Sequence, residues 1–226
     1  MTEDGGKDQR AHWDSVFGDA GNYFGEGPSE FGRSALEIFR GMGARDVLEL
    51  GCGQGRDSCL FASEGFNVTA LDYSETGICQ MRTRISDLCL SPRVHCMVRD
   101  ARSGIPLPDA SVDAVYSHMF FTMELREEEL QFIMDECRRV LRPGGVNLYS
   151  VRNDHDPHFR KGLHRGEDMW QSPAGFVVHF FTEEKVRRLA RGYDVMRIRE
   201  FDDPAKQYTR RLYEVLLRKP LTPPRR

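Results

Sequence analysis

Three alternate glycines at the end of a short apolar segment constrain the fold of this chain most strongly. Asp46-Val47-Leu48-Glu49-Leu50 is typical of a strand and runs directly into Gly51, Gly53 and Gly55, after which residues 56–63 are typical of a helix. Glycines at such a junction permit positive φ and let a ligand approach the backbone, whose N–H groups point at the bound group. The junction therefore predicts a nucleotide-type ligand beside the end of a buried strand.

Strand and helix patterns alternate along the rest of the chain. Expected strands cover residues 65–71, 94–98, 112–116, 146–151, 194–200 and 208–217, and expected helices cover residues 29–41, 74–88, 127–141 and 183–190. The helix at 127–141 has the clearest apolar face, and it ends at Arg142-Pro143-Gly144-Gly145, where proline and glycine forbid continuation. Thr182 is typical of an N-cap for the last helix. Residues 152–171 show no clear periodicity.

This alternation predicts an α/β fold. Right-handed crossovers give a doubly wound, mostly parallel sheet with helices on both faces, which is a Rossmann-like sandwich. Two successive strands at the C-terminus predict an antiparallel hairpin at one edge. We expect one domain over residues 10–218, with an N-terminal helical cap at 10–43 and a candidate lid loop at 152–171. Residues 1–9 are predicted to be disordered and residues 219–226 to form a flexible tail.

Composition narrows the compartment and the partners. The net charge of -3 gives no global basic field, which weighs against nucleic acid and anionic membranes. The longest apolar runs are far below the roughly 20 residues that cross a bilayer, and the acidic start does not resemble a signal peptide. The six cysteines have neither C-x-x-C nor zinc-finger spacing, so free thiols in a reducing cytosol are the simplest interpretation. We expect a cytoplasmic protein, and the oligomeric state is left open.

Two charged residues near the glycines select among ligands. A dinucleotide site requires G-x-G-x-x-G, but Arg56 occupies the position of the third glycine. Glu49 precedes the loop and suits a ligand with a cationic amino-acid end. Asp72 ends the next strand, where its carboxylate can accept hydrogen bonds from two ribose hydroxyls.

In order and spacing, these features resemble the class I S-adenosylmethionine-dependent methyltransferases over roughly residues 30–218. Residues 46–55 are similar to the first motif of that family, and Asp72 to its ribose-binding acid. Asp100-Ala101 resembles the pair that reads adenine, and the segments 107–113 and 142–145 resemble those that flank its fourth and fifth strands. The Gly-Arg-Asp continuation at Gly55 is similar to the small-molecule branch that includes tellurite-resistance and thiopurine methyltransferases.

The resemblance implies S-adenosylmethionine as cofactor and a set of residues that bind it. These are Tyr23, Glu49, Gly51, Cys52, Gly53, Gly55, Arg56, Asp72, Tyr73, Asp100, Ala101 and Ser117. Tyr73 would lie against adenine or pack at the start of a helix, and Tyr23 would belong to the cap. Arg56 and Asp57 could pair, contact the cofactor or simply begin a helix.

Histidines supply the candidate catalytic groups. His118 follows the fourth strand and is either a general base or a hydrogen-bonded structural histidine. The Asn/Asp-Pro-Pro-Tyr signature of amino-methylating relatives is absent there, which weighs against DNA and protein substrates. His155 and His158, with neighbouring acids, suit either a metal or a polar lid, and we favour the lid and predict no metal site, because Pro157 interrupts the spacing. His179 is expected in the core or in a pocket wall.

The sequence therefore predicts an enzyme that transfers a methyl group from S-adenosylmethionine to a small soluble acceptor by in-line displacement. One alternative is a methyltransferase-like protein that binds the cofactor without turnover. A less favoured alternative is a nicotinamide-dependent oxidoreductase, against which Arg56 weighs. The sequence defines neither the identity of the acceptor atom nor the need for a base.

Overall fold

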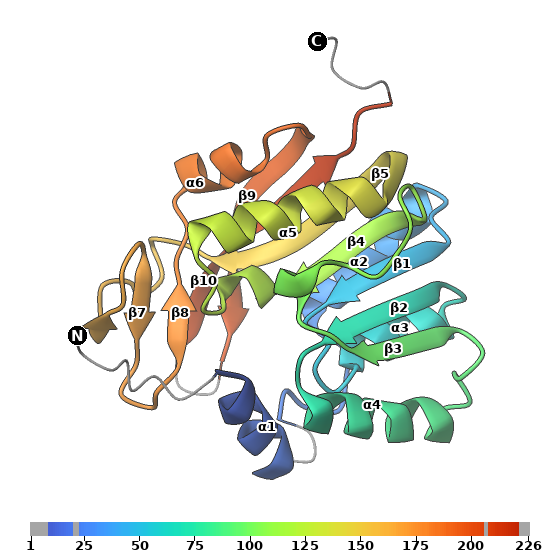
Figure 1. Cartoon of the computed structure of the whole chain (residues 1–226), viewed down its shortest axis with the longest axis horizontal. Helices are drawn as coiled ribbons and strands as arrows, with labels where there is room; N and C mark the ends of the chain where they lie inside the picture. Colours follow the sequence, from blue (N-terminus) through green and yellow to red (C-terminus); the bar gives the residue numbers. More distant parts are fainter. Residues whose placement is uncertain (1–8, 20–22, 206–207, 222–226) are drawn as a thin grey trace.

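The computed structural model describes residues 9–19, 23–205 and 208–221 (Figure 1). Its helices are α1 (Gln9–Asp19), α2 (Glu30–Gly41), α3 (Arg56–Ser63), α4 (Glu75–Asp87), α5 (Glu127–Val140) and α6 (Glu183–Leu189), with 3-10 turns η1 (Ala101–Ser103) and η2 (Phe120–Thr122). Its strands are β1 (Asp46–Leu50), β2 (Asn67–Asp72), β3 (Val94–Val98), β4 (Val112–His118), β5 (Leu141–Arg152), β6 (Leu163–His164), β7 (Met169–Gln171), β8 (Val177–His179), β9 (Asp194–Pro204) and β10 (Thr209–Arg218).

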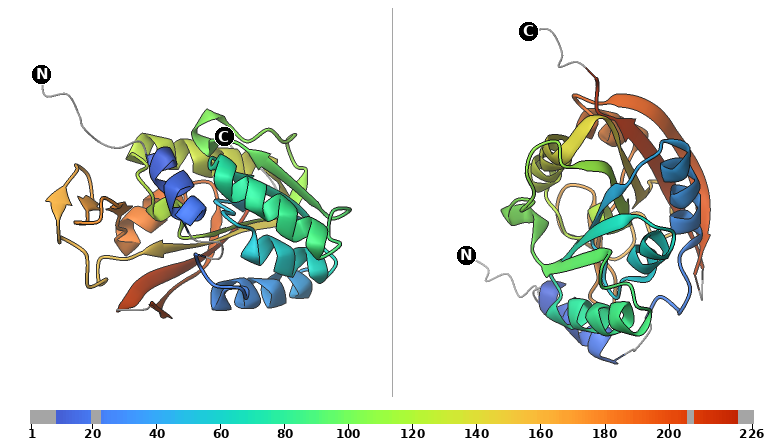
Figure 2. Two further views of the ribbon diagram at one scale, coloured as in Figure 1. Left: turned by 90° about the horizontal axis from the view of Figure 1, so that it is seen from below. Right: turned by 90° about the vertical axis from the view of Figure 1, so that its right-hand side faces the viewer.

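The central sheet confirms the predicted fold class. Within the described residues its strand order is β3-β2-β1-β4-β5-β10-β9. The first five strands are parallel, whereas β10 is antiparallel to both β5 and β9, so the C-terminal hairpin closes one edge. Figure 2 shows helices on both faces of this sheet. The order reverses between β1 and β4, and ligands of doubly wound sheets bind beyond the carboxyl ends of the strands at such a point.

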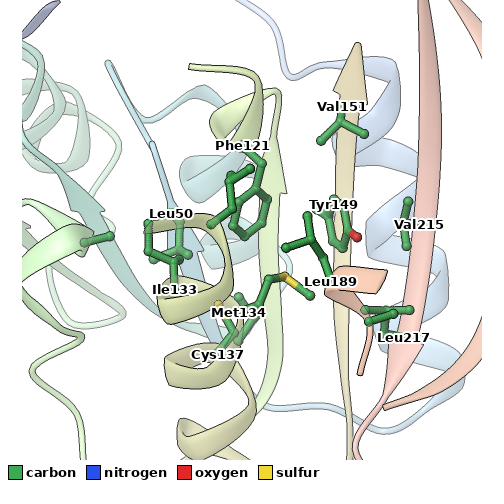
Figure 3. Close-up of a cluster of buried hydrophobic side chains, with 14 of the residues drawn as sticks. Leu50, Phe121, Ile133, Met134, Cys137, Tyr149, Val151, Leu189, Val215 and Leu217 are labelled. Atoms are coloured by element: carbon green, nitrogen blue, oxygen red, sulfur yellow. The ribbon is translucent and has the colours of Figure 1, made fainter. Parts of the chain in front are cut away.

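Two apolar cores cover the two faces of the sheet. On one face, α5 buries Leu130, Ile133, Met134, Cys137 and Val140, a spacing that places all five on one side of the helix. Figure 3 shows part of this cluster, with α5 beside Tyr149 and Val151 of β5. On the other face, α2, α3 and α4 cover the same sheet. Both faces of β1, β4 and β5 are thus largely removed from water, whereas the edge strand β3 keeps exposed residues. This burial is the main source of stability for such a fold.

The polar stretch at 152–171 contains more regular structure than its sequence predicts. Within the described chain, β6, β7 and β8 form a separate antiparallel sheet in the order β6-β7-β8. Strands of two or three residues are too short to display the alternating pattern of a half-buried strand. β5 also begins earlier than expected, at Leu141, with an irregular register between Val112 and Ala114 of its neighbour β4.

The two ends of the chain differ in part from the expected disorder. Gln9 belongs to α1, and its side-chain amide donates to the carbonyl of Val177 at 3.1 Å. Lys219 is also held, because its ammonium donates to the carbonyl of Leu141 at 2.6 Å and its N–H to the carbonyl of Gly145 at 2.8 Å. Residues 1–8 and 222–226 lie outside the described residues. No helix of the described residues is long and apolar enough to cross a membrane.

Candidate functional site

A cavity of about 860 Å³ lies at the carboxyl ends of β1, β2, β4 and β5. That volume is near the upper end of the roughly 300–1,000 Å³ typical of small-molecule sites. Its wall includes these predicted cofactor residues: Tyr23, Glu49, Gly51, Cys52, Gly53, Arg56, Asp72, Tyr73 and Ala101. His118 also lines it, whereas Gly55, Asp100 and Ser117 do not.

Asp72 connects the glycine loop to the end of the next strand. Its Oδ2 accepts a hydrogen bond from Gly53 N at 2.8 Å, and its Oδ1 accepts one from Ser74 N at 2.8 Å. Burial raises the pKa of Asp72, and the N–H donors of Ser74 and Gly53 act in the opposite direction. The backbone N–H of Tyr73 also donates to this carboxylate. Because each carboxylate oxygen can accept two hydrogen bonds, Asp72 keeps acceptor capacity for a ligand.

Two glycines of the loop are required by their backbone conformation and by the side chains packed against them. Gly51 has a φ of 70°, and a Cβ there would lie 2.9 Å from the ring of Phe120 at the cavity wall. Gly55 has a φ of 78°, and a Cβ there would lie 2.5 Å from Cγ of Met81. A side chain at either position would meet both the steric cost of positive φ and a direct clash. Gly55 is therefore explained by helix packing without any ligand.

Glu49 is a buried carboxyl group at the cavity wall, with 4 % of its surface exposed. Ser58 donates a short hydrogen bond to it. Burial raises the pKa of Glu49 well above its usual value, and the nearby charge of Asp57 raises it further. Such a carboxyl group is costly to ionise alone, so a cationic ligand that enters the cavity would stabilise its charged form.

Asp57 has a positioning role that the sequence alone leaves undecided. Its carboxylate accepts hydrogen bonds from the N–H and the hydroxyl of Ser29, both at 2.7 Å, and from the Tyr116 hydroxyl at 2.8 Å. Ser29 is the N-cap of α2, and its hydroxyl oxygen accepts from Gly32 N at 2.8 Å. Asp57 therefore fixes the start of α2 against β4 and does not pair with Arg56.

The N-terminal segment covers one side of the cavity. Arg56 donates to the carbonyl of Phe24 at 3.0 Å, and its guanidinium lies 5.3 Å from the centre of the Phe24 ring. Tyr23 N donates to the side-chain oxygen of Gln54 at 3.0 Å. Trp13 stacks on Phe24 with 6.0 Å between ring centroids. These contacts bring Trp13, Tyr23 and Phe24 to the cavity beside the glycine loop.

The adenine-binding pair predicted at Asp100-Ala101 is divided. Ala101 lines the cavity, but the carboxylate of Asp100 is paired with the side chain of Arg102, with Oδ2 accepting from Nη2 at 2.7 Å and from Nε at 3.0 Å. Burial alone would raise the pKa of Asp100, but the hydrogen bonds from Arg102 lower it. Ser117 is fully buried, and its Oγ has no hydrogen-bond partner among the described residues.

His118 lies at the end of β4 and lines the cavity. Its Nδ1 is 2.7 Å from Oγ of Ser150, which itself accepts a hydrogen bond from Met119 N at 3.1 Å. The ring stacks on Phe31 with 5.2 Å between centroids. Burial lowers the pKa of His118 to about 4, so the ring is neutral at physiological pH.

The other candidate histidines have separate partners. His155 Nδ1 lies 2.8 Å from Glu200 on β9, and His158 Nδ1 lies 3.2 Å from Nη2 of Arg152. His158 lines the cavity, whereas His155 does not. His179 is fully buried away from the cavity, between the carbonyl of Leu125 at 2.7 Å and Nζ of Lys185 at 2.9 Å. Of the two expected positions, the core and a pocket wall, His179 therefore occupies the core.

Comparison with known proteins identifies the domain. Residues 47–145 match the family model described as a methyltransferase domain. This part of the chain is therefore similar to the class I S-adenosylmethionine-dependent methyltransferase domains. The match begins in β1 and ends within the Arg142–Gly145 segment of β5, so it contains the glycine loop, Asp72 and His118.

Individual relatives agree with this assignment. The chain is 44% identical over 113 residues to a probable S-adenosylmethionine-dependent methyltransferase of Mycolicibacterium smegmatis, a match that covers 48% of this chain and 38% of the relative. It is 26% identical over 174 residues to the tRNA N(3)-cytidine methyltransferase METTL2 of Gallus gallus, over 73% of this chain and 46% of that protein. These matches therefore span less than half the length of either relative.

A solved structure shares the fold. The Burkholderia thailandensis 1,6-didemethyltoxoflavin-N1-methyltransferase, which holds 1,6-didemethyltoxoflavin and S-adenosylhomocysteine, superimposes with a TM-score of 0.69. The two chains are 18% identical, and the superposition covers 94% of this chain and 87% of the other. At this identity the likeness concerns the fold alone.

S-adenosylmethionine is the cofactor of this domain, and the residues of the cavity fit it. Gly51 and Gly53 have positive φ and line the cavity, so a ligand can approach the backbone of the loop. Asp72 keeps acceptor capacity for ribose hydroxyls, and the buried carboxyl group of Glu49 is suited to an ammonium group. A ligand with both groups matches the charges of this end of the cavity.

Proposed function

We propose that this protein transfers a methyl group from S-adenosylmethionine to a small acceptor bound in the same cavity. One observation carries the proposal: a single cavity extends from Glu49 and Asp72 at the glycine loop past His118 to Trp170 on β7. The first three residues lie at the ends of β1, β2 and β4, and Trp170 lies in the small second sheet. The cavity therefore has room for an acceptor beyond the cofactor end.

The bound cofactor supplies an electrophilic methyl group, and the protein has to align a nucleophile with it and exclude water. We propose that Asp72 holds the ribose hydroxyls and Glu49 the ammonium group. Gly51, Gly53, Cys52, Arg56, Tyr23, Tyr73 and Ala101 form the rest of the cofactor wall. Asp100 and Ser117 do not line the cavity, so we assign neither of them a contact with the cofactor.

His118 is assigned to the methyl end of the cavity. Its Nδ1 is occupied by Ser150, and burial lowers its pKa to about 4. Both features disfavour a general base that has to collect a proton at neutral pH. We propose that His118 donates a hydrogen bond to the acceptor, and that the acceptor arrives with its nucleophilic atom already free of a proton.

The enclosure of the cavity supports a small acceptor. Trp13 and Phe17 of α1 line it on one side, and Trp170, Val177 and Val178 of β7 and β8 line it on another. The relative METTL2 is named as a tRNA methyltransferase, so a nucleic-acid acceptor is the competing proposal. We also propose that the protein belongs to the small-molecule branch that includes tellurite-resistance and thiopurine methyltransferases, and that it acts in the cytoplasm.

Methyl transfer is tested by mass-spectrometric detection of S-adenosylhomocysteine. The full chain would be incubated with S-adenosylmethionine and one candidate acceptor at a time. The acceptors are a panel of small acids, phenols, amines and thiols, and total tRNA. We expect one class of small molecule to give more S-adenosylhomocysteine than the control without acceptor. We expect Asp72→Ala to abolish this increase. Turnover with tRNA alone would replace the small-molecule assignment. Cofactor binding with no turnover on any acceptor would support a protein that binds without catalysis.

A further inference from the structure

Charges on the cavity wall are unevenly distributed. Among the described residues that line the cavity, the acidic ones are Glu49, Asp57 and Asp72, and all three lie at the glycine-loop end. Three arginines line that end as well: Arg56, Arg84 and Arg99. The far end, around the end of β5 and the start of β10, carries no acidic lining residue among the described ones, and its basic side chains are those of Arg152, His158, Lys161 and Arg210. Trp170, Phe180 and Tyr208 line the same end and supply flat apolar surface.

Arg152 is the fixed centre of this basic end. Its Nε donates to Oδ2 of Asp156 at 3.0 Å, and its Nη2 donates to the other oxygen. Asp156 also accepts from the backbone N–H groups of His158 at 2.8 Å and Arg211 at 3.0 Å. The Arg152 guanidinium lies 5.1 Å from the ring centre of Phe180. Asp156 is thus saturated, whereas Nη1 of Arg152 donates to no described residue and stays available.

His158 is held as a hydrogen-bond donor. An arginine nitrogen can only donate, so His158 Nδ1 accepts the hydrogen bond from Arg152 at 3.2 Å. In the neutral ring the proton therefore resides on Nε2. Burial lowers the pKa of His158, and the Arg152 charge lowers it further, so the ring keeps this neutral form. Its ring lies 4.1 Å from that of Tyr208, between centroids.

The remaining two cations set the net charge. Arg210 is paired with Asp203, since Nη1 donates to Oδ2 at 2.7 Å, and Arg152 is paired with Asp156. Lys161 is exposed at the rim and forms no ion pair with a described residue. The basic end therefore carries an excess of about one positive charge and presents groups that donate and do not accept. A singly charged group made only of acceptors, such as a carboxylate, is complementary to it.

We propose that the far end of the cavity binds a carboxylate of the methyl acceptor, and that the aromatic wall holds a flat apolar body attached to it. This inference rests on the proposed function, because it concerns the acceptor of that reaction. Nη1 of Arg152, Nε2 of His158 and the Lys161 ammonium are the assigned donors, and Arg210 neutralises the nearby carboxylate of Asp203. The carboxylate anchors the acceptor while its other end extends toward His118.

A binding experiment tests the proposal without turnover. The full chain would be saturated with S-adenosylhomocysteine and titrated calorimetrically with 2-naphthoate, with the neutral 2-naphthamide and with the cationic 2-naphthylmethylammonium ion. We expect 2-naphthoate to bind at least tenfold more tightly than either of the others. Equal affinities, tighter binding of the cation, or no binding of any of the three would overturn the proposal.

Variants localise the effect. Lys161→Gln and Arg210→Gln should each weaken 2-naphthoate binding at least fivefold and leave 2-naphthamide and S-adenosylhomocysteine binding unchanged. Arg211→Gln is the matched control, because Arg211 is exposed, adjoins Arg210 on β10 and pairs with Asp202 at 3.4 Å. Because Arg210→Gln leaves the charge of Asp203 unpaired, Arg210→Gln/Asp203→Asn, which removes both charges and keeps the net charge of the basic end, should recover most of the lost affinity. If Arg211→Gln lost as much affinity for 2-naphthoate, the effect would come from the overall charge of the protein and the assignment would be overturned. Failure to bind S-adenosylhomocysteine would instead contradict the proposed function itself.

Discussion

The hydroxyl of Ser74 donates a hydrogen bond to Oδ1 of Asp14 at 2.6 Å, and Thr76 N donates to the same oxygen at 3.1 Å. Ser74 is the N-cap of α4, and its N–H donates to Asp72. One residue thus connects α1 to the acid that we assign to the ribose. α1 carries Trp13 and Phe17 to the cavity wall, so the cover of the site and the cofactor end are mechanically linked.

Replacing Asp14 should release this link. Asp14→Ala removes the carboxylate that accepts from Ser74 and Thr76 at the start of α4, where an anion is also favoured by the helix dipole. We expect the Kd for S-adenosylhomocysteine to rise about tenfold, which corresponds to about 1.4 kcal/mol. Calorimetric titration measures it. Asp19→Ala at the exposed end of α1 is the control, and equal affinities in the two variants would show that the link has no effect on binding.

Cofactor binding should release a proton from Glu49. Burial and the charge of Asp57 raise the pKa of Glu49 in the free protein, so part of the population holds a proton at mildly acidic pH. An ammonium group beside it favours the ionised form, and the affinity for S-adenosylhomocysteine should fall as pH decreases. The binding enthalpy measured near pH 6 should differ between phosphate and imidazole buffers, because the buffer takes up the released proton and adds its own protonation enthalpy.

Glu49→Gln supplies the comparison for that experiment. It should abolish the buffer-dependent difference and weaken binding about tenfold. Glu64→Gln, at the exposed end of α3, should behave as the unmodified protein does. A buffer-dependent enthalpy that persists in Glu49→Gln would place the proton elsewhere.

His118 should be neutral and protonated on Nε2. Ser150 Oγ accepts from Met119 N, and among the described residues Nδ1 of His118 is the acceptor for the Ser150 hydroxyl proton. Long-range proton–nitrogen NMR spectra of nitrogen-labelled protein report the tautomer directly. We expect the Nε2–H form at pH 7 and no titration above about pH 5, because burial lowers the pKa of His118 to about 4. A midpoint between pH 6 and 7 would return His118 to the role of a general base.

The buried His179 should make stability depend on pH. Burial, and then the Lys185 charge, lower the pKa of His179 to about 4 from the ordinary 6.5. Between these values the unfolded chain binds a proton that the folded protein does not, so the free energy of unfolding falls as pH decreases through that window. The contribution is at most about 3 kcal/mol.

Urea unfolding of the unmodified protein and of His179→Gln at pH 7 and pH 5 measures this effect. The variant will be less stable at pH 7, because it loses the contacts with Leu125 and Lys185, but its stability should change less between the two values. His95→Gln, on the exposed surface of β3, should keep the pH dependence of the unmodified protein. An unchanged pH dependence in His179→Gln would contradict the assignment.

Local patterns were sufficient to predict the sheet and the cofactor end of the cavity. The strands at Asp46–Leu50 and Val94–Val98 have the predicted bounds, because both are short apolar runs bounded by turn-forming or charged residues. The glycine loop, Glu49 and Asp72 lie within one strand–helix–strand unit, so their proximity follows from local geometry alone. The apolar face of α5 was predicted for the same reason.

The basic end of the cavity was not predictable from local sequence. Arg152 and Arg210 are 58 residues apart, and they meet because β10 pairs antiparallel to β5 with Leu212 opposite Arg152. The register of a long-range strand pair depends on the whole packed sheet. The role of Asp57 was missed for a related reason, since its partners Ser29 and Tyr116 come from two other elements. The pairing of Asp100 was predictable, because Arg102 lies only two residues further along the chain and its guanidinium donates to the Asp100 carboxylate.

Calorimetric titration of the full chain with S-adenosylhomocysteine tests the central claim most directly. We expect one binding site per chain with a Kd in the micromolar range or tighter, and a loss of at least tenfold in affinity in Asp72→Ala. Absence of binding up to about 1 mM ligand, equivalent to less than about 4 kcal/mol of binding free energy, in a folded protein would contradict it.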